Sequence, residues 1–267
     1  MGFGISNWRL ARAVSQLGQL GIVSGTALDV VIARKLQAGD PGGHTRRALE
    51  HFPFPHITKR IIDKYFVHGG LSGEEPFRKA PMHTLEGCRE PMELCMVGNF
   101  VEVFLAREGH ANPVGINYLE KIQMPLLPSL YGAMLAGAAV VIMGAGIPLV
   151  IPGILDALAH HRSVEYPVNI IGTDGSSRTF DLPFDPAMFI EDAPVPNPSK
   201  RPDFLPIVSS EALASILLRK ATGSIEGFVV EGNVAGGHNA PPRGKMTFRS
   251  ADEPVYGPRD VANLETF

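Results

Sequence analysis

Apolar residues follow two kinds of pattern along the chain, and together these patterns predict an α/β fold. Short runs rich in Val and Ile, bounded by Gly, Pro or polar residues, predict buried strands of a parallel sheet. Five such strands are expected, at residues 22–25, 114–117, 138–143, 206–209 and 227–230. Between them, apolar residues recur at helical spacing. The main helices are expected at residues 7–18, 29–38, 93–108, 127–135, 149–160 and 211–222.

The first of these helices has a clear beginning and a clear apolar face. Asn7 is the predicted N-cap, because a short polar side chain can bind the free N–H groups of the first turn. Gly18 is expected to end the helix. The residues expected on its inner face are Trp8, Leu10, Ala11, Val14 and Leu17.

Two segments interrupt the alternation of strands and helices. Residues 45–110 are longer than an ordinary connection and predict an insertion above the sheet, with short helices before a polar loop. Residues 162–205 hold a predicted hairpin with its turn at 173–177, followed by a proline-rich loop. We therefore predict a single domain over residues 1–267 that carries these two insertions.

The segment from Gly132 to Leu155 carries no charged residue and is long enough to cross a bilayer. Five glycines and two prolines interrupt it, however. These glycines and prolines favour a helix, a buried strand and a second helix over one membrane helix.

Composition narrows the class of protein. A chain of 267 residues with 45% hydrophobic residues, 19% charged residues and a net charge of −3 describes an ordinary globular domain without a basic surface for nucleic acid. Two cysteines do not make a disulfide framework, and with His83 they match no zinc template. The start of the chain does not read as a signal peptide, so the cytoplasm is the expected compartment.

One stretch combines the features of a site. The apolar run Phe228–Val230 leads through Glu231 and Gly232 to Gly236, Gly237 and His238. A strand fixes position, glycines allow a flat ligand to approach the backbone, and an imidazole can move a proton near neutral pH. The alternative is a loop histidine that binds a carbonyl group.

The motif Glu231-Gly232-x-x-Ala235-Gly236-Gly237-His238 resembles a signature of the nitronate monooxygenases, also called 2-nitropropane dioxygenases. These are enzymes that hold flavin mononucleotide (FMN) on a TIM barrel. The start of the chain, Met1 to Ala11, is similar to the family's first flavin-contacting turn and the helix after it. The resemblance covers most of the chain in segments and is most specific at its two ends.

The resemblance implies a (β/α)₈ TIM-barrel-like fold that is incomplete. A TIM barrel has eight strands, and the first should precede the glycine turn that begins here at Gly2. No match to the family's last two βα units, with their phosphate-binding turn, follows residue 244. We therefore expect a barrel that lacks its first strand and its final βα units, and an open barrel leaves two unpaired edges.

The resemblance also implies roles for particular residues. His238 would be the catalytic base, and Gly236 and Gly237 would bring the backbone close to FMN or the substrate. Asn117 matches a strand end that hydrogen-bonds the flavin ring, although a turn or cap residue is equally compatible. The remaining candidates for binding FMN are Gly2, Phe3, Gly4, Ser209 and Glu231.

These candidates have simpler interpretations too. Gly2–Gly4 would then be a disordered terminus, and Glu231 a solvated carboxylate. For Ser209 we favour the N-cap of the helix that starts at Glu211.

Three functions remain open on the sequence. The first is FMN-dependent oxidation of nitronates or nitroalkanes with oxygen. The second is the related chemistry of flavin-dependent enoyl-acyl-carrier-protein reductases and polyunsaturated fatty acid synthase subunits, which take electrons from a nicotinamide. The third is a truncated, inactive chain without flavin. The expected partner is a small-molecule substrate rather than nucleic acid or a membrane, and a homodimer is a candidate assembly.

Overall fold

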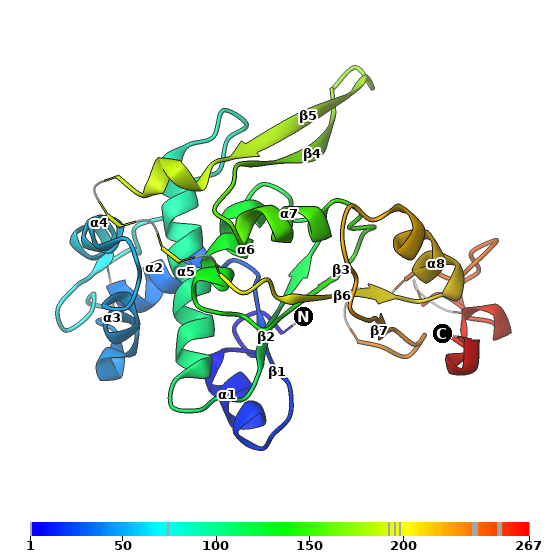
Figure 1. The fold of residues 1–267 in the computed structure, drawn as a ribbon, viewed down its shortest axis with the longest axis horizontal. Coiled ribbons are helices and arrows are strands. Elements are labelled where there is room, and N and C mark those ends of the chain that lie inside the picture. The colour runs from blue at the N-terminus through cyan, green and yellow to red at the C-terminus, as the bar shows by residue number, and fades with distance from the viewer. Residues whose placement is uncertain are drawn as a thin grey trace.

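The chain folds into a curled, five-stranded parallel half-barrel sheet with helices on its outer side (Figure 1). A two-stranded hairpin projects from one end of the molecule, and the C-terminal segment lies beside the last strand. The computed structural model describes residues 2–73, 75–191, 193–194, 196–197, 199–236, 240–249 and 253–266.

The sheet contains the five strands that the apolar runs predict. They are β1 (Gly21–Ser24), β2 (Val114–Leu119), β3 (Val140–Gly144), β6 (Asp203–Val208) and β7 (Val229–Val230). All four neighbouring pairs are parallel, in the order β1-β2-β3-β6-β7. β7 was expected to be buried, but both of its residues are half-buried because it is a short edge strand.

The predicted helices are also present, and the structure sets their bounds. They are α1 (Trp8–Gln16), α2 (Leu28–Gln37), α3 (His44–Leu49), α4 (Pro55–Tyr65), α5 (Arg89–Arg107), α6 (Leu126–Leu135), α7 (Ile151–Leu158) and α8 (Glu211–Lys220). Short 3₁₀ turns occur at η1 (Pro41–Gly43), η2 (Pro186–Phe189), η3 (Pro258–Asp260) and η4 (Leu264–Thr266).

The helix α5 packs on the outer side of β1 and β2. It lies in the range 45–110 that reads as an insertion, yet it packs against α1, α2 and α6 as well as β1 and β2. Two glycines allow the close approach. A Cβ atom on Gly98 would lie 2.5 Å from the Leu28 carbonyl oxygen, and one on Gly132 would lie 2.1 Å from the Met96 carbonyl oxygen.

A buried polar network joins α5, α6 and β2. The Tyr118 hydroxyl donates to Asn99 Oδ1 at 2.9 Å and to the Ser129 carbonyl at 3.0 Å. Asn99 Nδ2 donates to the Cys95 carbonyl at 2.9 Å, and Cys95 Sγ lies 2.9 Å from Ser129 Oγ. Burial raises the pKa of the Cys95 thiol and of Tyr118, so both groups stay protonated near neutral pH.

α1 confirms the predicted cap and corrects the predicted face. Asn7 Oδ1 accepts from the N–H groups of Arg9 and Leu10. Leu10 and Leu17, expected on the inner face, are 48% and 80% exposed. Ser15 is buried instead, because its hydroxyl accepts from Gly21 N and donates to the Pro113 carbonyl where β1 and β2 begin.

The predicted hairpin consists of β4 (Val164–Ile171) and β5 (Ser177–Phe184), paired antiparallel. Its base is fastened to the end of β2, because the Tyr166 hydroxyl donates to Glu120 Oε1 at 2.6 Å. Val164, Tyr166 and Val168 alternate with exposed residues, so one face of β4 packs on the core.

The charge-free segment 132–155 folds as predicted, with the end of α6, then β3, then the start of α7. Within the residues that the structure describes, no helix has the length and apolar character needed to cross a membrane.

Candidate functional site

A cavity of about 400 Å³ opens at the carboxyl ends of β2, β3, β6 and β7. Ligand sites in open parallel sheets occupy this edge, because loops there vary while the strands fix their positions. The volume is within the usual range for small-molecule sites. The lining includes Asn117, Leu119, Lys121, Gly144, Ala145, Gly146, Ile147, Ile207, Ser209, Leu213, Glu231, Gly236, Ala240 and Pro241.

Asn117 presents an unpaired group to this cavity. It is the fourth residue of β2, and its Oδ1 atom is buried without a hydrogen-bond partner among the described residues. The neighbouring residue in register on β1 is Ser24, whose Oγ atom is buried and unpaired in the same sense. Buried polar atoms are rarely left unpaired, so two on adjacent strands indicate that this surface binds a polar ligand or water.

The end of β3 brings bare backbone to the cavity. Gly144 and Gly146 both line it, with Ala145 between them at φ 57°. A left-handed alanine is strained by about 1 kcal/mol or more, and such strain collects at binding sites. A Cβ atom on Gly144 would lie 2.8 Å from Ile207 Cδ1, so a larger residue would not fit without a shift of that side chain.

Ser209 lines the cavity and is not the N-cap of α8. Ser210 fills that role, because its side chain accepts from Leu213 N at 3.3 Å. The prediction that Ser209 caps the helix is therefore wrong by one residue. Ser209 therefore has no capping role, and it lies at the carboxyl end of β6 where the cavity opens.

The segment after β7 forms another wall. Glu231 N donates to the Val208 carbonyl at 2.8 Å, which extends the pairing of β6 and β7 toward the cavity. Ala240 and Pro241 line the cavity from the C-terminal segment. Arg243 Nη2 donates to the Ser209 carbonyl at 3.1 Å, and the Tyr256 hydroxyl donates to the Ala240 carbonyl at 3.0 Å.

The C-terminal segment is braced internally as well. Asp260 Oδ1 accepts from Arg243 N at 2.8 Å, and Asp260 Oδ2 accepts from Gly257 N at 2.7 Å. These two backbone N–H groups, with that of Arg243 the stronger influence, lower the pKa of Asp260. These bonds fix Arg243, whose side chain joins the C-terminal segment to the Ser209 carbonyl at the end of β6.

The structure thus brings together four of the residues predicted to bind a cofactor: Asn117, Ser209, Glu231 and Gly236. Gly237 and His238 lie outside the described residues. Gly2, Phe3 and Gly4 do not line the cavity within the described part of the chain. Their turn continues to Ser6, whose carbonyl accepts from Ser24 N at 2.8 Å, so it lies at the carboxyl end of β1, and Phe3 is 53% exposed.

Sequence reasoning missed several lining residues, among them Lys121, Ala240 and Pro241. It also missed Ser24, the register partner of Asn117, although both lie near the ends of predicted strands and the two ends could have been compared. Lys121 follows β2 by two residues and places a positive charge at the cavity. A lone lysine after a strand carries no sequence signal of this kind.

The described residues contain no group of three or more His, Cys, Asp or Glu side chains that could hold a metal ion. Cys88 is exposed and Cys95 is buried, and both are free thiols. Comparison of the chain with models of protein families found no match, and comparison with curated proteins found none either.

Proposed function

We propose that the chain is an FMN-dependent oxidoreductase of the nitronate monooxygenase type, built on a partial TIM-barrel-like fold. The observation that carries this proposal is the cavity at the carboxyl ends of the parallel strands, which is lined by Asn117, Ser209, Glu231 and Gly236. Glu231 and Gly236 of the motif, and the strand end at Asn117, come from distant parts of the sequence. Their convergence on one cavity is what a shared cofactor site requires.

The residues present fit a planar, polar ring. Asn117 Oδ1 is a buried acceptor with no partner in the described residues, and an N–H group of the flavin ring would satisfy it. Gly144 and Gly146 have no side chain that would keep a flat ring away, and Ala145 between them adds only a methyl group. Lys121 would face the negative charge of the phosphate group.

FMN, when bound, supplies the redox chemistry by accepting an electron pair from the substrate. The protein would supply binding, orientation and proton transfer. His238, through an imidazole nitrogen, would take the proton from the carbon that carries the nitro group. Ser209 and Glu231 would orient the polar part of the ligand from the ends of β6 and β7.

The first experiment is to purify the full chain and record its visible spectrum before and after incubation with FMN. The proposal expects flavin absorbance that stays with the protein through gel filtration. A folded protein that remains colourless with excess FMN would favour an inactive chain and would remove the flavin hypothesis.

A second experiment separates the two flavin enzymes. Consumption of oxygen with a nitroalkane such as 2-nitropropane supports the monooxygenase, whereas oxidation of NADPH with an enoyl thioester supports the reductase. His238→Ala should reduce nitroalkane turnover about 100-fold or more while FMN stays bound, since general-base catalysis contributes a factor of that order. Unchanged turnover in this variant would exclude His238 as the base.

A further inference from the structure

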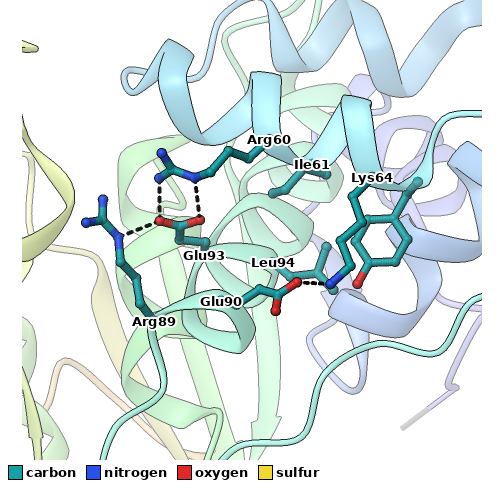
Figure 2. A pocket seen from close by; sticks show the side chains of 8 residues that line it. Arg60, Ile61, Lys64, Arg89, Glu90, Glu93 and Leu94 are labelled. Atoms are coloured by element: carbon teal, nitrogen blue, oxygen red, sulfur yellow. Dashed lines mark hydrogen bonds and ion pairs between the residues drawn. The ribbon is translucent and has the colours of Figure 1, made fainter.

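A second cavity, which shares no lining residue with this site, lies between helices α4 and α5. Its volume is about 410 Å³, and residues of both helices line it (Figure 2). Arg60, Ile61 and Lys64 project from α4, while Glu93 and Leu94 project from the first turns of α5.

The middle of this cavity is apolar. Ile61 and Leu94 lie between the two charged ends and are 5% and 1% exposed. Tyr65, which is 2% exposed, also lines the cavity. An elongated apolar group could therefore lie between the helices and be removed from water.

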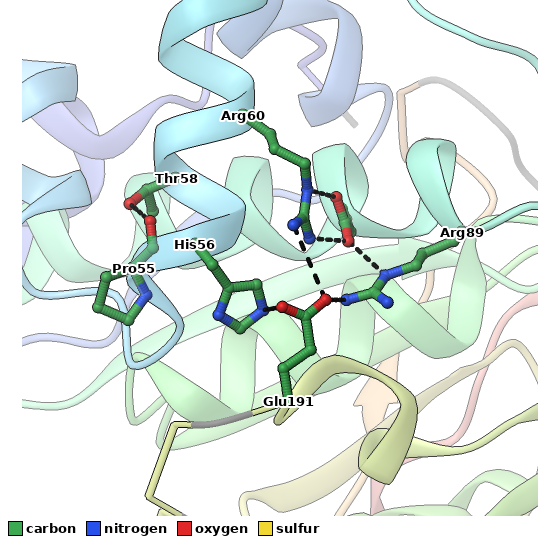
Figure 3. Close-up of polar contacts among 7 residues, drawn as sticks. Pro55, His56, Thr58, Arg60, Arg89 and Glu191 are labelled. Carbon is green, nitrogen blue, oxygen red and sulfur yellow. Dashed lines mark hydrogen bonds and ion pairs between the residues drawn. The ribbon is translucent and has the colours of Figure 1, made fainter.

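One charged end is closed by a buried carboxylate. Glu93 accepts from Arg60 Nη2 at 2.6 Å and from Arg89 Nε at 2.7 Å, and its side chain is only 6% exposed. The same arginines contact Glu191, which also lies 3.5 Å from His56 Nε2 (Figure 3). An anion that bound these arginines would leave the buried Glu93 carboxylate without its ion-pair partners. This end is therefore unfavourable for a second negative charge.

The other end is easier to open. Lys64 pairs with Glu90, but the two side chains are 37% and 49% exposed. Exposed pairs of this kind contribute little to stability, so Glu90 can turn to water at small cost. Lys64 would then be free to bind another anion.

Tyr65 supplies a second donor at the Lys64 end. Its buried hydroxyl has no hydrogen-bond partner of normal geometry in the described residues, and Lys64 Nζ lies 5.5 Å from the centroid of its ring. Burial raises the pKa of Tyr65, so the hydroxyl stays protonated and can donate.

We propose that the cavity between α4 and α5 binds a medium-chain monocarboxylate. The carboxylate would replace Glu90 at Lys64 and accept from the Tyr65 hydroxyl, while the alkyl chain would lie on Ile61 and Leu94. Binding at this site is independent of flavin and of turnover.

Titration calorimetry of the full chain with sodium octanoate at pH 7 tests the proposal directly. We expect one saturable site with a Kd on the order of 1 mM or tighter, given the size of the ligand. 1-Octanol, which has the same chain but no charge, should bind about 10-fold more weakly because the charge-assisted bonds are lost. Equal binding of the two ligands, or no saturable binding of octanoate, overturns the proposal.

Substitutions that are expected to weaken octanoate binding, and one that is expected to strengthen it, locate the site. Lys64→Met should weaken octanoate binding about 10-fold, and Tyr65→Phe about 3-fold, because each removes one donor. Glu90→Gln should strengthen it about 3-fold, because the competing carboxylate is gone.

Lys59→Met and Asp63→Asn are the matched controls. Like Lys64→Met and Glu90→Gln, they remove one positive and one negative charge, here from an ion pair on α4 whose side chains are 75% and 61% exposed and lie outside the cavity lining. Both should leave octanoate binding within about 2-fold of the parent. If Lys59→Met weakens binding as much as Lys64→Met does, octanoate responds to net charge alone and the proposed site is wrong.

Discussion

The two faces of the parallel sheet differ sharply although the same strands make both. On β2, Val114, Ile116 and Tyr118 point outward and are at most 4% exposed beneath the helices. Asn117 and Leu119 point to the concave side and are only half-buried. The outward residues are buried, whereas the concave side borders the cavity and carries an amide oxygen with no partner in the described part of the chain.

This contrast separates what stabilises the fold from what is available to a ligand. Register partners share a face, so Ser24 on β1, Asn117 on β2, Ile142 on β3 and Leu205 on β6 form one row across the concave side. Two residues of this row, Ser24 and Asn117, have buried oxygens with no partner among the described residues, and Leu205 is only half-buried. We infer that the outer face contributes more to the stability of the fold than the concave face does.

The largest expected difference in stability is between the substitutions of two isoleucines, one on each face of the sheet. Ile116→Ala removes a fully buried side chain from the outer face and should lower the free energy of unfolding by about 2–5 kcal/mol. Ile207→Ala removes the same atoms from the concave face, where Ile207 is half-buried at the cavity, and should cost about 1 kcal/mol. Urea denaturation followed by circular dichroism measures both values.

The two isoleucines also predict opposite effects on the ligand site. Ile207→Ala should change FMN retention, and Ile116→Ala should change it only as far as the protein unfolds. Equal losses of stability in the two variants would show that both faces are packed alike, and the contrast would then be lost.

An intermediate effect is expected from the polar network beneath the helices. Tyr118→Phe leaves Asn99 Oδ1 and the Ser129 carbonyl without their shared donor, so it should cost about 1–3 kcal/mol. Tyr256→Phe is the control in the C-terminal segment. It removes one bond to the Ala240 carbonyl and should cost about 0.5 kcal/mol or less.

The same tyrosine predicts a dependence on alkaline pH. Burial, and to a smaller extent Cys95, raises the pKa of Tyr118 well above its ordinary value. Below pH about 10, Tyr118 is protonated in both states and has no effect. Above that pH only the unfolded state releases the proton, so stability should fall by about 1.4 kcal/mol per pH unit for this group. Tyr118→Phe should reduce the alkaline slope by that amount, and an unchanged slope would contradict the assignment.

The sheet and its helices could be predicted because local patterns encode them. Apolar runs bounded by glycine, proline or polar residues mark β1, β2, β3 and β6, and helical spacing marks the helices between them. The position of α5 could not be predicted in this way. Its apolar residues lie on nearly every side, so their spacing does not show that α1, α2 and α6 surround it.

The candidate site was predicted in part for a similar reason. Asn117 and Ser209 end strands, and parallel strands bring such ends to one edge, so their convergence follows from topology. The cap of α8 was misplaced by one residue, because Ser209 and Ser210 are chemically equivalent and only backbone geometry distinguishes them. Ala240 and Pro241 are held at the cavity by hydrogen bonds that Arg243 and Tyr256 donate. No local sequence pattern predicts these bonds.

The smallest effect on stability, and the largest on FMN binding, is expected at Asn117, with the buried Asn99 as the comparison. Asn99 is fully buried on the helical side and both of its polar atoms are bonded, so Asn99→Leu should cost about 2 kcal/mol or more. Asn117→Leu removes an oxygen that has no partner among the described residues, and it should change stability by about 0.5 kcal/mol or less, in either direction. The same change should weaken FMN binding about 10-fold, because the ring would lose its acceptor. Fluorescence titration with FMN, read beside urea denaturation, separates the two effects. If Asn117→Leu destabilises the fold as much as Asn99→Leu does, the Asn117 amide is part of the core. Its oxygen would then not be available to accept a hydrogen bond from a ligand.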